Sequence, residues 1–199
     1  MPYNPNIHHR RSIRLKGYDY SQAGAYFITI CCQNKIHLFG HIENGEMILN
    51  DAGRMVEKWY YELENKFPDI KCHEMIVMPN HFHCIVENVG SVGVDLRVSP
   101  DKTMNNMTLL DEQPLLDEPL LGEHIGSPLH RVVQWFKTMT TNEYIRGVKN
   151  LGWQPFDKKI WQRNYWEHII RDEQSYLNIS NYIINNPAKW KKDKFWDKK

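Results

Sequence analysis

Two short apolar segments separated by only two residues place the tightest constraint on how this chain can fold. Residues 71–78 (KCHEMIVM) and 81–87 (HFHCIVE) are rich in residues that favour strands, and Pro79-Asn80 between them is a turn signal. A two-residue connection can join antiparallel strands but not parallel strands, which need a long crossover. The sequence therefore predicts an antiparallel pair of strands here.

The remaining patterns place this pair within a recognisable order of strands and helices. Spacing, caps and breakers indicate strands, a small hairpin and amphipathic helices. Strands are predicted at 24–33 and 161–170, and a small hairpin around Asn44-Gly45. Helices are predicted at 52–65 after a cap at Asn50 or Asp51, at 127–147, and from the Asp172 cap to about Asn186. The order predicts an α+β, ferredoxin-like (RRM-like) split β-α-β fold: an antiparallel sheet with helices on one face, an extra N-terminal hairpin and an added C-terminal helix. The third strand of that fold, here 81–87, is central.

Length and charge predict one domain with one insertion. At 199 residues, the chain fits a single domain over 1–199. Residues 89–127 hold seven acids against Arg97 and Lys102, a net charge of −5, so the rest of the chain carries +6. We expect this acidic segment to be a surface insertion. Basic residues interleaved with Tyr and Trp near both ends suit a polyanion that offers bases for stacking.

Several classes of protein do not fit the sequence. The N-terminus lacks the apolar run of a signal peptide, and no segment is long and apolar enough to cross a bilayer. We therefore expect a soluble, cytoplasmic protein. The four cysteines lie in apolar runs without C-x-x-C spacing, which favours buried free thiols over zinc sites. The adjacent Cys31 and Cys32 are expected on opposite faces of a strand.

The segment His81-Phe82-His83 is the first candidate for a functional site. Residues two apart on a strand point to the same face, so both imidazoles can reach one ion, while Phe82 points into the opposite layer. Two neutral imidazoles on a rigid strand make half of a metal site. A pair of surface histidines on an exposed sheet face is the alternative.

The last helix offers the residues that such a half-site needs. Its polar stripe contains Ser175, Asn178, Tyr182, Asn185 and Asn186, and its apolar stripe contains Tyr176, Leu177, Ile179, Ile183 and Ile184. Because Tyr182 and Asn186 are four residues apart, the hydroxyl and the amide oxygen can meet beside one ion. The alternatives are a packing role for Tyr182 and a C-cap role for Asn186 before Pro187.

Ordered motifs along the chain resemble the REP-associated tyrosine transposases, which are HUH single-tyrosine transposases (U is a bulky hydrophobic residue). MPNHFH at 78–83 is similar to the MPNH-x-H signature of that family. Further similar segments are RSIRL at 11–15, GYDY at 17–20, YFIT at 26–29, WQRNY at 161–165, Glu167-His168, Tyr182-Ile183 and Asn186-Pro187. They run from about residue 10 to 190, interrupted by the acidic insertion, and are far more specific than H-x-H alone.

The resemblance implies an enzyme that cuts and rejoins DNA. It makes His81 and His83 ligands of Mg²⁺ or Mn²⁺, Tyr182 the nucleophile on a catalytic last helix, and Asn186 the third ligand, a position held by glutamine in many relatives. Tyr165, which lies on a predicted strand, is the second candidate for the nucleophile. The implied reaction nicks hairpin-associated single-stranded DNA through a 5′-phosphotyrosine intermediate and then transfers the strand.

The implied partner is single-stranded DNA with a hairpin, either REP-like or an insertion-sequence end, handled at the nucleoid of a bacterial cytoplasm. Basic side chains are the candidate DNA contacts: Arg10, Arg11, Arg14, Lys16 and Arg163. The family includes monomers and dimers, so the resemblance allows a homodimer.

The main alternative is a non-catalytic module of the same fold that binds single-stranded nucleic acid. The aromatic RNP signature of RRM domains is absent, and a histidine pair takes the central-strand position. Relaxase-type nucleases also contain H-x-H, but their motifs usually follow a different order.

Overall fold

The computed structural model describes residues 22–90 and 128–196. Within them, a four-stranded antiparallel sheet has the order β4 (Ile70–Met78), β5 (His81–Asn88), β1 (Gly24–Cys31) and β6 (Trp166–Ile170). The predicted central position of the third strand is confirmed, because β5 pairs with β4 on one side and with β1 on the other.

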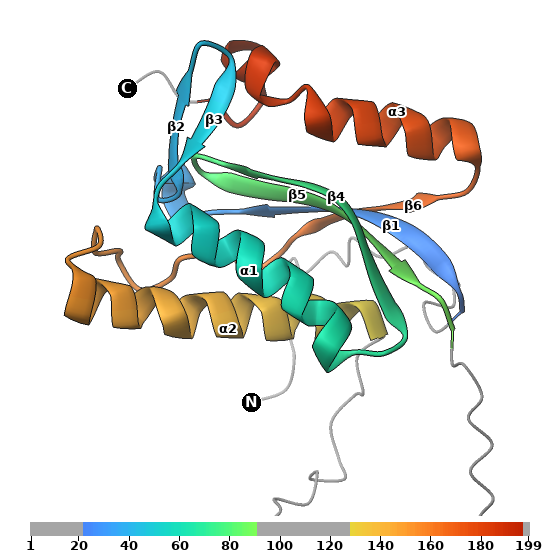
Figure 1. Ribbon diagram of the computed structural model, residues 1–199, viewed down its shortest axis with the longest axis horizontal. Coiled ribbons are helices and arrows are strands. Elements are labelled where there is room, and N and C mark those ends of the chain that lie inside the picture. Colours follow the sequence, from blue (N-terminus) through green and yellow to red (C-terminus); the bar gives the residue numbers. More distant parts are fainter. Residues whose placement is uncertain (1–21, 91–127, 197–199) are drawn as a thin grey trace, which may run out of the picture.

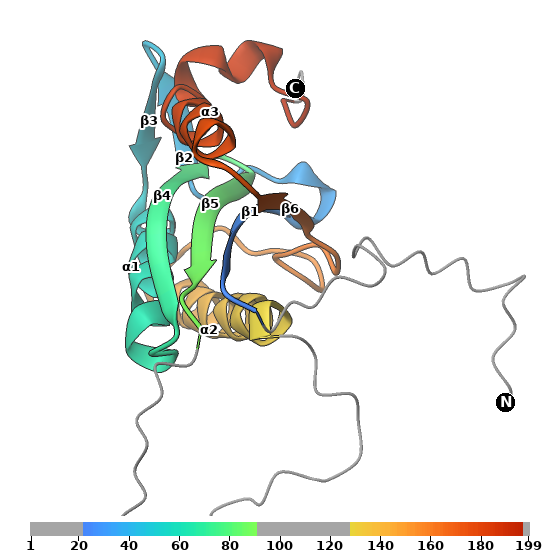
Figure 2. The ribbon, with the colours of Figure 1, turned by 90° about the vertical axis from the view of Figure 1, so that its right-hand side faces the viewer.

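Helices cover both faces of this sheet (Figures 1 and 2). The helices α1 (Asp51–Lys66) and α2 (Pro128–Leu151) pack together on one face. The helix α3 (Glu173–Ile184) lies across the other face, and the 3-10 helix η2 (Pro187–Lys192) follows it. The predicted ferredoxin-like α+β fold with an added C-terminal helix is confirmed.

Strand alternation divides β5 between the two layers. Phe82 points toward α1 and α2, where it contacts Tyr60 and Phe136 in the main core. His81 and His83 point to the opposite face, toward α3, as expected for residues on either side of Phe82. The main core thus anchors the strand while leaving its other face for polar groups.

Local sequence signals explain the smaller elements. The hairpin of β2 (Gly40–Glu43) and β3 (Glu46–Leu49) turns at Asn44 and Gly45, whose φ angles are 51° and 84°. Positive φ at both central residues is what a type I′ hairpin turn requires, and Asn-Gly tolerates it. A short 3-10 helix, η1 (Gln33–Lys35), follows β1. The cap of α1 is Asn50, whose side chain accepts from the Gly53 amide.

Two predicted boundaries differ from the structure by four residues or more, and β1 and α3 each end two residues before the predicted limit. The helix α2 continues to Leu151 instead of ending near Gly147, because the glycine with a positive φ that ends it is Gly152 (φ 69°), while Gly147 lies inside the helix against the Trp153 ring. The strand predicted over 161–170 is ordered as β6 only from Trp166 onward. The Trp161 indole is held instead by α2, where it donates to the Thr140 hydroxyl (2.9 Å).

All four cysteines are free, and Cys31 and Cys32 belong to different clusters on opposite sides of the sheet, as predicted. No helix in residues 22–90 and 128–196 has the length and apolar character needed to span a membrane. The candidate DNA contacts Arg10, Arg11, Arg14 and Lys16 lie outside the described residues, as does most of the predicted acidic insertion.

Candidate metal and nucleophile site

His81 and His83 lie together on β5, beneath α3. Their side chains are 0% and 1% exposed, and their ring centroids are 4.5 Å apart. The alternative of two surface histidines is therefore wrong. Because β5 is hydrogen-bonded on both edges, the two rings project from a rigid support.

Hydrogen bonds behind His81 decide which of its ring nitrogens can bind a ligand. The Asn80 amide nitrogen donates to the Phe195 carbonyl (2.9 Å), so the amide oxygen faces His81 Nδ1 at 2.8 Å. That oxygen can only accept, so Nδ1 carries the proton and Nε2 keeps its lone pair. His81 Nε2 is buried and has no hydrogen-bond partner within the described residues. A buried lone pair of this kind suits a metal ion.

His83 is held in a similar way by β1. Its Nδ1 lies 2.8 Å from the Thr29 hydroxyl, and its Nε2 lies 3.4 Å from the Tyr182 hydroxyl. Burial lowers the pKa of His81 to about 4, and burial together with the neighbouring His81 lowers the pKa of His83 well below 6.5. Both rings are neutral near neutral pH, the form that binds metals.

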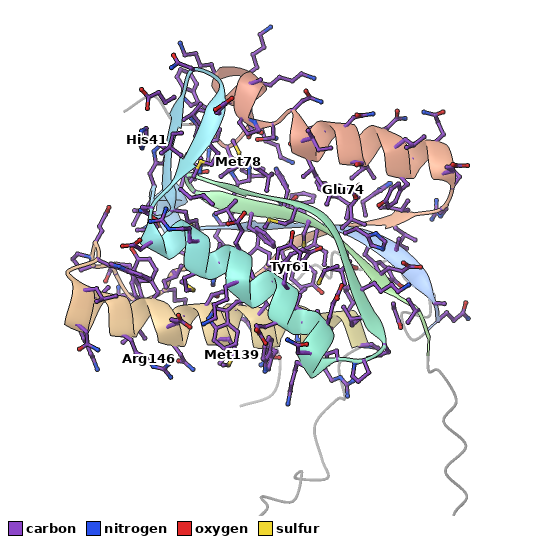
Figure 3. All side chains as sticks on the ribbon, viewed as in Figure 1. His41, Tyr61, Glu74, Met78, Met139 and Arg146 are labelled. Atoms are coloured by element: carbon purple, nitrogen blue, oxygen red, sulfur yellow. The ribbon has the colours of Figure 1, made fainter. Side chains whose placement is uncertain are left out.

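The orientation of α3 depends on apolar packing and on polar contacts to β4. Ile183 is fully buried against the sheet, and the Tyr176 hydroxyl donates to Glu74 (2.7 Å), which is labelled beneath α3 in Figure 3. The predicted apolar stripe is partly wrong, because Leu177 and Ile184 are exposed. The face of α3 that contacts the sheet runs through Tyr176 and Ile183, and Leu177 and Ile184 lie outside that face.

This orientation brings Tyr182 and Asn186, which the spacing placed on one helical face, to the histidine pair. Tyr182 is 38% exposed and its ring packs edge-on against Phe27. Asn186 is 2% exposed, and its side-chain oxygen is buried with no hydrogen-bond partner in the described part of the chain. The C-cap of α3 is Asn185, so the C-cap interpretation of Asn186 is wrong.

Asp193 is a member of the site that the sequence reasoning missed. One carboxylate oxygen and one ring nitrogen from each of His81 and His83 all lie within 4.8 Å of one another. Asp193 Oδ2 accepts from the Asn186 amide (3.2 Å) and lies 3.4 Å from the Tyr182 hydroxyl. The signal that could have revealed it is a single acid within the lysine-rich segment KWKKDK just after the last helix.

An open pocket of about 510 Å³ leads to this cluster. Phe27, Thr29, His83, Tyr182 and Asn186 line it, and three cations surround it: Lys189, Lys192 and Lys194. Burial, followed by the Asp193 charge, raises the pKa of Tyr182 to about 12. A tyrosine in these surroundings keeps its proton at neutral pH unless another group assists its removal.

The donor set fits a divalent cation. Two imidazole nitrogens and a carboxylate oxygen converge, and the Asn186 amide nitrogen donates to that carboxylate. Two atoms, His81 Nε2 and Asn186 Oδ1, are buried without other partners in the described residues. Such a mixed nitrogen and oxygen set suits Mg²⁺ or Mn²⁺, and the imidazoles would equally accept zinc. His81, His83, Asp193 and Asn186 are therefore the residues that could hold the ion.

The structure places two other candidates away from this cluster. Tyr165 is buried with the main core on the α2 side, near Lys137 and His130, so it lies on the other side of the sheet from His83. Arg163 is exposed and lines a different groove beside α2. Tyr182, and not Tyr165, is thus the tyrosine beside the histidines.

The fold and site define a ferredoxin-like protein with an H-x-H strand and a tyrosine-bearing helix laid over it. No family model matches the sequence. A protein of Haemophilus influenzae named "Uncharacterized protein" is 43% identical over 194 residues, which cover 98% of this chain and 97% of that protein. The chain belongs to the same family as this protein.

The named similarities are to transposases. A Haemophilus influenzae protein named "Putative REP-associated tyrosine transposase" is 53% identical over 30 residues, which are 15% of this chain and 17% of that protein. The solved structure of a REP-associated tyrosine transposase bound to a REP hairpin has a TM-score of 0.48 and 17% identity, over 84% of this chain and 68% of that chain. A Deinococcus radiodurans structure described as a "putative transposase" has a TM-score of 0.42 and 11% identity, over 86% of this chain and 95% of that chain. The short sequence match supports the resemblance that the motifs indicate.

Proposed function

We propose that this protein is a metal-dependent transposase that nicks and rejoins single-stranded DNA through Tyr182. The observation that carries the proposal is the position of the Tyr182 hydroxyl, 3.4 Å from both His83 Nε2 and Asp193 Oδ2 in the candidate metal cluster. A nucleophile beside a set of metal ligands is the arrangement that phosphodiester chemistry needs. The ordered motifs point to DNA that carries a hairpin.

His81, His83 and Asp193, with Asn186, would hold Mg²⁺ or Mn²⁺ here. When bound, such an ion polarises the scissile phosphodiester. Thr29 and Asn80 occupy the two Nδ1 atoms, which would leave both Nε2 atoms as the ligands of the ion.

The chain's own residues then account for the transfer. Asp193 Oδ2 receives the proton of Tyr182 as the phenolic oxygen bonds to phosphorus and the bond to the 3′-oxygen breaks. The departing oxygen takes a proton from water and leaves as a 3′-hydroxyl, Asp193 returns its proton to the solvent, and the tyrosine retains a 5′-phosphate ester. A second 3′-hydroxyl attacks that ester and returns the proton to Tyr182, so the joining step needs no ATP.

Side chains at the pocket suit a single strand. Lys189, Lys192 and Lys194 offer charge to phosphates. Trp166 is 62% exposed, and it pairs with Thr29, which pairs with His83, so the three side chains form one row on this face. Trp166 is therefore placed to stack on a base next to the cleavage point.

The test is a covalent adduct. We would incubate the wild type with labelled, hairpin-bearing single-stranded DNA and Mn²⁺, then separate the products on a denaturing gel. Tyr182→Phe should abolish the adduct, while Tyr176→Phe, on the same helix, and Tyr165→Phe should retain it. A chelator should block the adduct and leave DNA binding in place. The absence of an adduct on every such DNA, with binding intact, would favour the non-catalytic binding module instead.

A further inference from the structure

A second open groove, also about 510 Å³, lies on the α2 side of the sheet, away from the metal cluster. One wall is a face of α2 that includes Gln134, Lys137 and Asn142, and the other wall is the segment 158–165 before β6. The described residues that line it include lysines, an arginine, amides and hydroxyls, but no carboxylate. Its chemistry therefore favours an anionic, hydrogen-bonding ligand.

Three of its cations are available to a ligand. Lys158, Lys159 and Arg163 are exposed, and none of the ion pairs formed among the described residues involves them. Lys137 differs, because its ammonium donates to the carbonyl oxygens of Gln162 (2.9 Å) and of the next two residues. Lys137 thus ties residues 162–164, including Arg163, to α2, and Lys158 and Lys159 line the same groove.

The groove also connects to the metal site around one edge of the sheet. Arg163 lies three residues before Trp166, at the start of the edge strand β6. The Trp166 side chain is on the metal-site face, where the Lys194 ammonium lies 5.4 Å from its ring centroid. The exposed Arg163 and Trp166 are thus three residues apart at this edge, and Lys194 lies both over the Trp166 ring and at the pocket of Tyr182.

We propose that this groove is a second binding site for single-stranded DNA, which holds the substrate strand away from the point of cleavage. The inference rests on the proposed function for the identity of the strand. Lys158, Lys159 and Arg163 bind phosphates, and the amides of Gln134 and Asn142 face the bases or sugars. The single strand passes over β6 into the metal site.

The test compares two triple variants that remove equal charge. Lys158→Ala/Lys159→Ala/Arg163→Ala removes the groove cations. Lys66→Ala/Lys71→Ala/Lys149→Ala removes three exposed lysines elsewhere on the surface. Binding of a fluorescein-labelled DNA hairpin with single-stranded flanks is measured by anisotropy over a range of salt concentrations, and thermal unfolding verifies that both variants are folded.

The groove variant should bind the DNA at least about tenfold more weakly at low salt, with a salt slope smaller by about 2, while the control stays close to wild type. Equal affinity and slope for the groove variant and the wild type would overturn the inference without affecting the Tyr182 adduct. If the wild type forms no adduct but the groove variant still loses binding, the proposed function fails and the DNA site stands.

Discussion

The candidate metal site depends on hydrogen bonds made behind the candidate ligand atoms. His81 is directed by the Asn80 side chain, whose orientation depends in turn on the Phe195 carbonyl. Asp193 also holds this region, because its Oδ1 accepts from the Phe195 amide at 2.7 Å. The segment after α3 therefore orients one histidine and supplies a carboxylate at the same time.

Asp193 should matter more than Asn186 for metal binding. A carboxylate brings a negative charge to a divalent cation, whereas the Asn186 amide is neutral and also steadies Asp193 through its 3.2 Å hydrogen bond. We expect Asp193→Ala to weaken Mn²⁺ binding by more than about 10-fold, and Asn186→Ala to weaken it less. Isothermal titration with Mn²⁺ measures both, and a larger loss for Asn186→Ala would make Asn186 the principal ligand.

Burial of His81 should make the metal-free protein sensitive to acid. Its pKa is lowered from 6.5 to about 4, chiefly by burial. Below pH 6.5 His81 is protonated in the unfolded chain, but in the folded chain it is protonated only near pH 4. The free energy of unfolding therefore falls as the pH drops across this range. The loss approaches about 3 kcal/mol for this one group.

Urea unfolding in the presence of a chelator measures this loss. His81→Gln should show a smaller decrease over the same range, because the titrating group is gone while carboxylate titration is common to both proteins. Parallel curves for the two proteins would contradict a strongly lowered pKa for His81.

At the scale of elements, strand and helix patterns were enough to predict β5 and the start of α3, and they placed Tyr182 on the polar stripe of the last helix, while its place beside the histidines was expected from the family resemblance. Periodicity did not predict the features that depend on tertiary packing, namely the buried face of α3 and the position of Asp193. Leu177 and Ile184 are exposed because the sheet packs against a different face of α3. A helical wheel shows which residues share a face but not which face meets the sheet. Asp193 lies after a 3-10 turn whose position depends on the packing of Trp190 and neighbouring aromatic residues around His81, so no local pattern placed it.

Gly147 provides a test of how α2 is packed. In an open helix, Gly→Ala stabilises by roughly 0.5–1 kcal/mol, but a Cβ at Gly147 would lie 2.2 Å from the Trp153 ring. We therefore expect Gly147→Ala to destabilise the fold by about 1–3 kcal/mol in urea unfolding. In a Trp153→Ala background the same change should cost little or become stabilising, and an unchanged cost there would mean that Trp153 is not the cause.

At the scale of the whole molecule, the two faces of the sheet have separate tasks. The main core beneath α1 and α2 fixes the central strands, and the α3 face carries the buried polar cluster. The edge strand β6 lies between the cluster and the groove of Lys158, Lys159 and Arg163. A strand of DNA that uses both must therefore pass this edge.

This geometry predicts that flank length and the groove cations act through the same contact. Shortening the single-stranded flank that passes Trp166 should leave the hairpin bound but lower its affinity and its rate of adduct formation, because the strand no longer reaches the groove. Wild type should lose affinity on shortening, whereas Lys158→Ala/Lys159→Ala/Arg163→Ala should be nearly insensitive to flank length. In a double-mutant cycle, two changes that remove one shared contact do not add. Anisotropy and adduct yield on a series of hairpins trimmed from either end measure this coupling, and strictly additive losses would place the flank elsewhere on the molecule.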